Sequence, residues 1–77
     1  MKTKFKYPEV NTAKIKNVMH YAMYREDYYE VRYHSGRIVT YRLSDMPMTV
    51  YKFITDSTKQ SIQYSNVFNR TVLIYEP

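Results

Sequence analysis

The stretch that most constrains the fold is Tyr28–Leu43, YYEVRYHSGRIVTYRL, where apolar and polar residues alternate on both sides of a glycine. Alternation with a period of two predicts strands with one buried face, and a glycine between two such runs predicts a hairpin turn. Gly36 is the only glycine in the chain, and glycine adopts positive φ angles without a steric penalty. We therefore predict an antiparallel hairpin that reverses at Gly36.

The length of the turn decides the register of this hairpin. A two-residue loop at Ser35-Gly36 would mix polar and apolar residues on each face, whereas a three-residue loop, Ser35–Arg37, separates them. The predicted apolar pairs are Tyr33 with Val39, Val31 with Tyr41, and Tyr29 with Leu43. The predicted polar pairs are Glu30 with Arg42, Arg32 with Thr40, and His34 with Ile38. Glu30 opposite Arg42 would form a cross-strand ion pair.

The segment before the hairpin, Lys14–Tyr24, also alternates. Its two parities are Ile15, Met19, Tyr21 and Met23 on one side, and Lys14, Lys16 and His20 on the other. This pattern predicts a strand with one solvent-exposed face, followed by a turn at Arg25–Asp27.

After Leu43 the apolar residues recur at helical spacing. They are Met46, Val50, Phe53 and Ile54, followed by Ser57. With Ser44-Asp45 as the N-cap and Pro47 in the first turn, we predict a short helix from Pro47 to about Ser57. A helix of this length is unstable alone, so it should pack on the tyrosine-rich face of the hairpin.

The C-terminal part is less regular. Ser61–Tyr64 fits no single periodicity, Ser65-Asn66 is a turn candidate, and Thr71–Tyr75 is apolar on both parities. A strand of that last kind needs cover on both sides, so it is either a central strand or an edge completed by another copy of the chain.

Together these segments predict a small α+β fold, in which an antiparallel sheet of three to five strands carries one short helix on one face, in the order β-β-β-α-β. Residues 14–77 would form the single domain, and residues 1–13 a basic N-terminal arm with Lys2, Lys4 and Lys6. The absence of cysteine favours a reducing compartment, the cytoplasm. The apolar runs are too short to span a bilayer.

Part of this pattern resembles a known family. Val31-Arg32-Tyr33, Gly36, Tyr41, Pro47, Val50-Tyr51 and Ile54 resemble the KTSC domain, over about residues 10–57. The resemblance implies a small α+β domain with an antiparallel sheet. In that family the domain occurs at the end of some lysyl-tRNA synthetases and as stand-alone bacterial and phage proteins, a setting that suits an RNA or DNA role.

The charge balance points toward anionic partners. Twelve Lys and Arg against seven Asp and Glu give a net charge of +5 on only 77 residues. If the first strand lies beside the hairpin, its cations share the sheet face opposite the helix with those of the hairpin. The candidate binding residues on this face are Lys14, Lys16, His20, Arg32, His34, Arg37 and Arg42. An ordinary solvated face of an antiparallel sheet has similar residues.

Catalytic and metal-binding patterns are weak. His20 and His34 would need a third metal ligand, and the only carboxylate predicted on their face is Glu30, beside Arg42. His34 with Glu30 is the one acid–base pair that the pattern allows, and a solvated histidine at a hairpin end is the plainer interpretation. There is no phosphate-binding glycine loop and no cysteine nucleophile. We predict no metal, no cofactor and no enzyme activity.

Two functions remain open. The first is a non-enzymatic module that binds RNA, DNA or a host nucleoprotein surface through the cationic face. The alternative is a small phage-type inhibitor, anti-defence or anti-CRISPR in kind, that binds a host complex through protein contacts. Its ten tyrosines and five methionines suit adaptable contact surfaces. A homodimer through Thr71–Tyr75 is a further prediction, and a membrane partner is not predicted.

Overall fold

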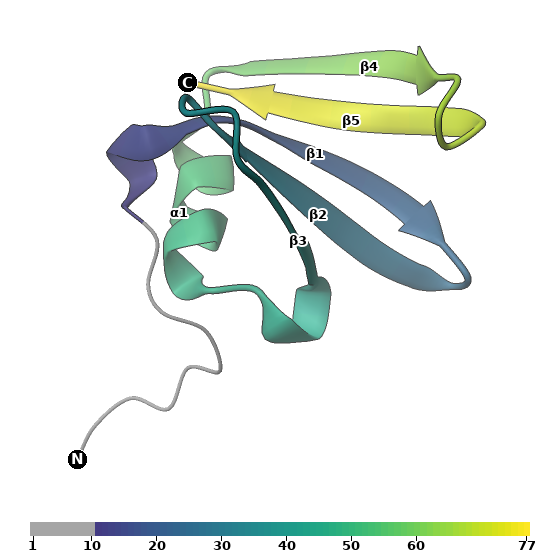
Figure 1. Ribbon diagram of the computed structural model, residues 1–77, viewed down its shortest axis with the longest axis horizontal. Helices are drawn as coiled ribbons and strands as arrows, with labels where there is room; N and C mark the ends of the chain where they lie inside the picture. Colours follow the sequence, from purple (N-terminus) through teal and green to yellow (C-terminus); the bar gives the residue numbers. More distant parts are fainter. Residues whose placement is uncertain (1–10) are drawn as a thin grey trace.

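Five antiparallel strands form one sheet in the order β3-β2-β1-β5-β4, in a computed structural model that describes residues 11–77 (Figure 1). The strands are β1 (Ile15–Met23), β2 (Glu26–Tyr33), β3 (Ile38–Arg42), β4 (Lys59–Ser65) and β5 (Arg70–Glu76). The helix α1 (Met48–Asp56) connects β3 to β4, and short 3-10 helices, η1 (Thr12–Lys14) and η2 (Leu43–Asp45), precede β1 and follow β3. The predicted α+β class is confirmed. Lys2, Lys4 and Lys6 lie outside the described residues.

The β2–β3 turn contains three residues, as predicted, but it begins one residue earlier. The backbone N–H of Tyr33 donates to the carbonyl of Arg37 at 2.9 Å, so the loop is His34–Gly36. Gly36 takes φ +96° at its last position, where a three-residue loop requires a left-handed residue. The predicted loop placed this glycine in the middle, and the predicted pairs are therefore wrong.

The true register is shifted by two residues, so each face keeps its composition. Val31 pairs with Val39, and Tyr29 pairs with Tyr41. Glu30 lies opposite Thr40 instead of Arg42. The predicted separation of apolar and polar side chains within this hairpin is correct because a shift of two preserves the alternation.

A β-bulge in β1 changes which of its residues face the helix. The pairing with β2 shifts between Ile15 and Asn17, so one extra residue is inserted into β1. Ile15 and Val18 consequently share the helix-side core, whereas Met19 and Tyr21 belong to a second cluster. The predicted grouping of Ile15 with Met19 and Tyr21 is wrong for this reason, because strict alternation counted from Ile15 ignores the inserted residue, which reverses the faces of all later residues.

The helix packs on the predicted face of the hairpin. Val50 and Phe53 of the helix, with Met46 just before it, form one core with four residues of the sheet, which are Ile15, Val18, Val31 and Tyr41. The N-cap is Pro47, not Ser44-Asp45, which belongs to η2. Proline fits a helix N-terminus because the N–H groups of the first turn have no intrahelical acceptor.

The C-terminal hairpin supplies the last two strands. Ser61–Tyr64, undecided from the sequence, is part of β4, and β5 pairs with β4 along its whole length. β5 also pairs with β1, but only where Val18–His20 meet Leu73–Tyr75. Beyond this contact the β4–β5 ribbon diverges from β1 (Figure 1). The central-strand alternative for Thr71–Tyr75 is confirmed.

The turn of the C-terminal hairpin covers part of the sheet face opposite the helix. Phe68 from this turn stacks on Tyr21 with ring centroids 4.2 Å apart. Met19, Tyr21 and Val72 are buried in this second cluster. The guanidinium of Arg70 donates to the backbone carbonyl of Ala22 and so ties the start of β5 to β1.

None of the helices within residues 11–77 combines the length and apolar character needed to cross a lipid bilayer.

Candidate functional site

The seven basic residues predicted to share one face lie in three separate places. Arg32 and Arg42 lie on the sheet face opposite the helix, because they share the parity of Glu30 and Thr40. His20 lies on the helix side, opposite Tyr29, which packs against the helix-side core. The remaining four gather at one end of the sheet; they are Lys14, Lys16, His34 and Arg37. The prediction of one continuous basic face is therefore wrong. His20 lies on the helix side because the bulge in β1 reverses the faces of the residues that follow it.

Arg32 and Arg42 are both ion-paired. Arg32 Nε lies 2.9 Å from Glu30 Oε2, and Glu30 is only 8% exposed. Arg42 Nε lies 3.5 Å from Glu26 Oε1. The predicted Glu30–Arg42 pair is wrong, since the register places Glu30 two residues away along the sheet. This face thus combines paired charges with the second apolar cluster, which contains Met19, Tyr21 and Val72. A phosphate bound there would have to compete with Glu30 and Glu26 for the two guanidinium groups.

His20 is bonded within the protein. Its Nε2 lies 3.0 Å from Asp27 Oδ1, and its ring stacks on Tyr29 with centroids 4.4 Å apart and planes 7° from parallel. This contact was not predicted, because Asp27 was expected to lie in the turn. The turn is instead Tyr24-Arg25, and both residues have positive φ, 54° and 65°.

Tyrosines near these carboxylates have raised pKa values. Burial raises the pKa of Tyr29 most, and the charge of Asp27 adds to it. Burial likewise raises the pKa of Tyr21, with the charge of Glu30 second. Both phenols are therefore neutral at physiological pH and present no anionic charge.

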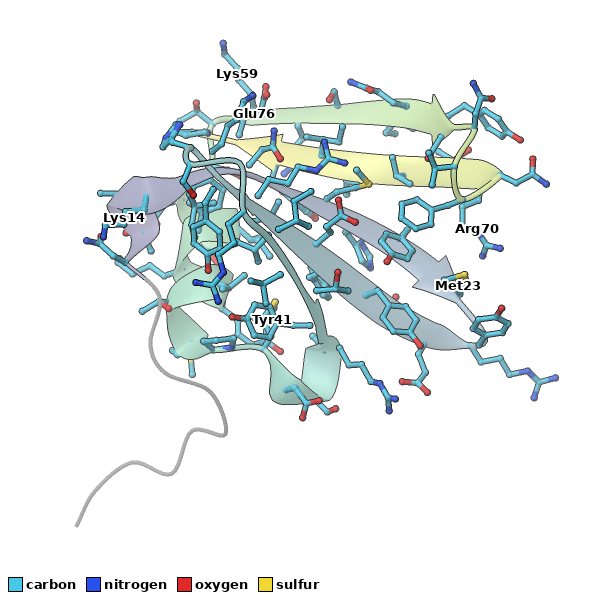
Figure 2. The ribbon with its side chains drawn as sticks, in the orientation of Figure 1. Lys14, Met23, Tyr41, Lys59, Arg70 and Glu76 are labelled. Carbon is cyan, nitrogen blue, oxygen red and sulfur yellow. The ribbon has the colours of Figure 1, made fainter. Side chains whose placement is uncertain are left out.

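Four cationic or titratable residues define a surface that we call the basic end: Lys14, Lys16, His34 and Arg37. The backbone N–H of His34 donates to the carbonyl of Lys14 at 3.0 Å, which holds the β2–β3 turn against η1. All four residues are exposed. Figure 2 shows Lys14 at one end of the sheet and Met23 at the other.

The cations of the basic end have no ion-pair partner in the described part of the chain. No carboxylate of residues 11–77 lies within ion-pair distance of Lys14, Lys16 or Arg37. They differ in this respect from Arg32 and Arg42. Within residues 11–77, the basic end brings together cations from two separate segments that have no carboxylate partner.

A shallow hollow lies beside this surface. It measures about 180 Å³ and is lined by Thr12, Phe53, Asp56, Ser57 and Pro77. Pockets for small organic ligands usually measure roughly 300–1,000 Å³. Within residues 11–77, no three or more His, Asp or Glu side chains are grouped so that they could hold a metal ion. Glu30 is bonded to Arg32, and His34 is solvent-exposed at the hairpin end.

Comparison with known proteins adds no assignment: no family model matches the chain, and no curated protein or solved structure matches it. The resemblance to the KTSC domain stays a prediction based on the motif residues.

Proposed function

We propose that this chain is a non-enzymatic module that binds the phosphate backbone of RNA or DNA through the basic end. The observation that supports this proposal is the contrast between the two sets of cations. Arg32 and Arg42 are held by carboxylates, whereas Lys14, Lys16 and Arg37 are exposed and lack such partners among residues 11–77.

Unpaired cations contribute more to nucleic-acid affinity than paired cations do. Cations gain affinity when they replace the counterions condensed on the phosphates. An arginine already paired with a carboxylate must first lose that partner, so it contributes less. Lys14, Lys16 and Arg37 have no carboxylate partner among residues 11–77 and need no such exchange, and the hydrogen bond from the His34 N–H to the Lys14 carbonyl holds their two segments together. The exposed imidazole of His34 lies at the margin of the same surface.

Titration of the full chain with a labelled single-stranded oligonucleotide tests the proposal. The three permanent cations should give a log–log dependence of affinity on salt with a slope of about 2 to 3 in magnitude, at roughly 0.7–0.9 per phosphate contact. Arg37→Gln should weaken binding and lower this slope by about one phosphate contact.

Arg25→Asn is the matched control for Arg37→Gln. Arg25 is also an exposed arginine in a turn, but at the opposite end of β1 and β2. Asparagine tolerates the positive φ that Arg25 adopts. Equal losses of affinity in the two variants would mean that only net charge matters, and an undetectable affinity at low salt would remove the proposal.

A second candidate function is that of a small inhibitor that binds a host protein complex, and a separate observation supports it. The β4–β5 ribbon exposes Ile62 at 75%, Tyr64 at 60% and Val67 at 86%. If this ribbon is the contact surface, complex formation survives nuclease treatment and Arg37→Gln, and it is lost on replacing Ile62 with a charged residue. If the chain instead binds nucleic acid through the basic end, Arg37→Gln weakens binding and replacement of Ile62 leaves it unchanged.

A further inference from the structure

Strand β4 is an unprotected edge of the sheet. It pairs with β5 through all seven residues without a register shift, and its other side has no neighbouring strand in the described sheet. Six of its seven residues are exposed. Natural edge strands are usually shortened, bulged, or protected by proline and charged residues. β4, with the sequence KQSIQYS, has one charge at its start and no proline.

The opposite edge of the sheet differs. β3 has only five residues, ends at Arg42, and continues directly into η2. Arg42 is ion-paired with Glu26 of the neighbouring strand. Of the two edges, β4 is therefore the one that offers a long and regular row of unpaired backbone groups.

We propose that β4 pairs antiparallel with β4 of a second copy of this chain, about a two-fold axis at Ile62. Ile62 is the middle residue of the seven. Pairing about it would place Ile62 opposite its own copy, with Tyr64 opposite Gln60 and Ser65 opposite Lys59. The two sheets would then join into one continuous ten-stranded sheet.

Charge favours this antiparallel arrangement of identical strands. Lys59 is the only charged residue of β4, and Figure 2 shows it extending away from the sheet at the start of the strand. In the antiparallel pair the two Lys59 side chains lie about 20 Å apart, six steps of roughly 3.4 Å. A parallel pair would place the two Lys59 side chains side by side. This would add a local repulsion between two chains that each already have a net charge of +5.

Burial of apolar surface also favours the antiparallel β4–β4 pair. Ile62 is 75% exposed and pairs with Leu73 of β5 on the same sheet face. An isologous contact would shield both copies of Ile62 and bring each Tyr64 close to them. A symmetric interface of this kind closes on itself and does not extend into a fibre. The inference does not depend on the proposed nucleic-acid function.

Sedimentation velocity over a range of protein concentrations tests the dimer. The unmodified chain should sediment with the mass of two chains, and Ile62→Lys should sediment as one, because two like charges would meet on the axis. Val67→Lys is the matched control, since Val67 is still more exposed and lies in the turn beyond β4. Ile38→Lys probes the β3 edge in the same way, and both controls should remain dimeric.

A cross-link tests the register independently of stability. The chain has no cysteine, so Ile62→Cys introduces one thiol per copy, and directly opposed residues of antiparallel strands have Cβ atoms about 4.5–5.5 Å apart. Mild oxidation should convert most of Ile62→Cys into a disulfide-linked dimer and leave Val67→Cys monomeric under denaturing conditions. An unmodified chain that stays monomeric at millimolar concentration would overturn the proposal, as would dimerisation lost in Ile38→Lys but retained in Ile62→Lys.

Discussion

The backbone N–H of His34 donates to the carbonyl oxygen of Lys14 at 3.0 Å, which joins the β2–β3 turn to the 3-10 helix before β1. These residues are twenty positions apart in the chain, and each belongs to an exposed segment with cationic side chains. The contact turns two separate basic stretches into one surface. The proposed function depends on that juxtaposition rather than on the net charge alone.

The turn that makes this contact depends on Gly36. A methyl group at Gly36 would meet no atom within 4 Å, so any cost of Gly36→Ala comes from its backbone conformation, φ +96°. We expect Gly36→Ala to lower the free energy of unfolding by roughly 1–2 kcal/mol, and Gly36→Asn by less. Denaturant unfolding monitored by circular dichroism measures both. Equal stability of the alanine variant and the unmodified chain would contradict this account of the turn.

Glu30 holds Arg32 on the face opposite the helix. Glu30→Ala leaves that guanidinium without its carboxylate beside an apolar cluster, and we expect a loss of about 1 kcal/mol in the free energy of unfolding. Glu26→Ala removes the partner of Arg42, where both side chains are about half exposed, and should cost no more than about 0.5 kcal/mol. Comparing the two variants by denaturant unfolding separates a half-buried pair from an exposed one.

The second cluster predicts unequal effects for two neighbouring residues. Phe68 is partly buried against Tyr21, so Phe68→Ala should lower the free energy of unfolding by about 2 kcal/mol, below the usual range for a fully buried phenylalanine. Val67 is 86% exposed, and Val67→Ala should change it by less than about 0.5 kcal/mol. Similar losses at both positions would mean that the turn does not cover the sheet as described.

Alkaline pH tests the environment of Tyr21 and Tyr29. Their pKa values are raised in the folded chain above the usual tyrosine value of 10.0, so the folded state retains their protons to a higher pH than the unfolded state does. Their contribution to the free energy of unfolding should be constant below pH 10 and decrease as the pH rises above it. Tyr29→Phe should weaken this decline, as measured by denaturant unfolding at pH 8 and at pH 10.5. An unchanged decline in that variant would indicate another titrating group.

The sequence was sufficient to predict those parts of the fold that follow from periodicity. Alternation around Gly36 predicted the hairpin and its two faces, and helical spacing of Met46, Val50 and Phe53 predicted the helix and the side that it buries. The register of the hairpin could not be predicted from alternation, because two registers that differ by two residues place the same side chains on each face. The left-handed position of Gly36 decided between them.

The candidate site was predicted only in part. Lys14, Lys16, His34 and Arg37 were named correctly as exposed basic residues, but their grouping at one end depends on the contact between η1 and the turn. The bulge after Ile15 moved His20 to the other face. Arg32 and Glu30 lie two residues apart on β2 and share a face, and their ion pair was missed because Glu30 was expected to pair with Arg42. A two-residue shift preserves both faces, so alternation alone cannot reveal it, whereas the residue inserted in β1 reverses the faces that strict alternation from Ile15 assigns.

Amide chemical shifts of the isotopically labelled chain, recorded during titration with a short single-stranded oligonucleotide, test the central claim most directly. We expect the largest changes at residues 14–16 and 34–37, and little change at the amides of Arg32 and Arg42. Changes concentrated at Arg32 and Arg42, with those two segments unaffected, would contradict it.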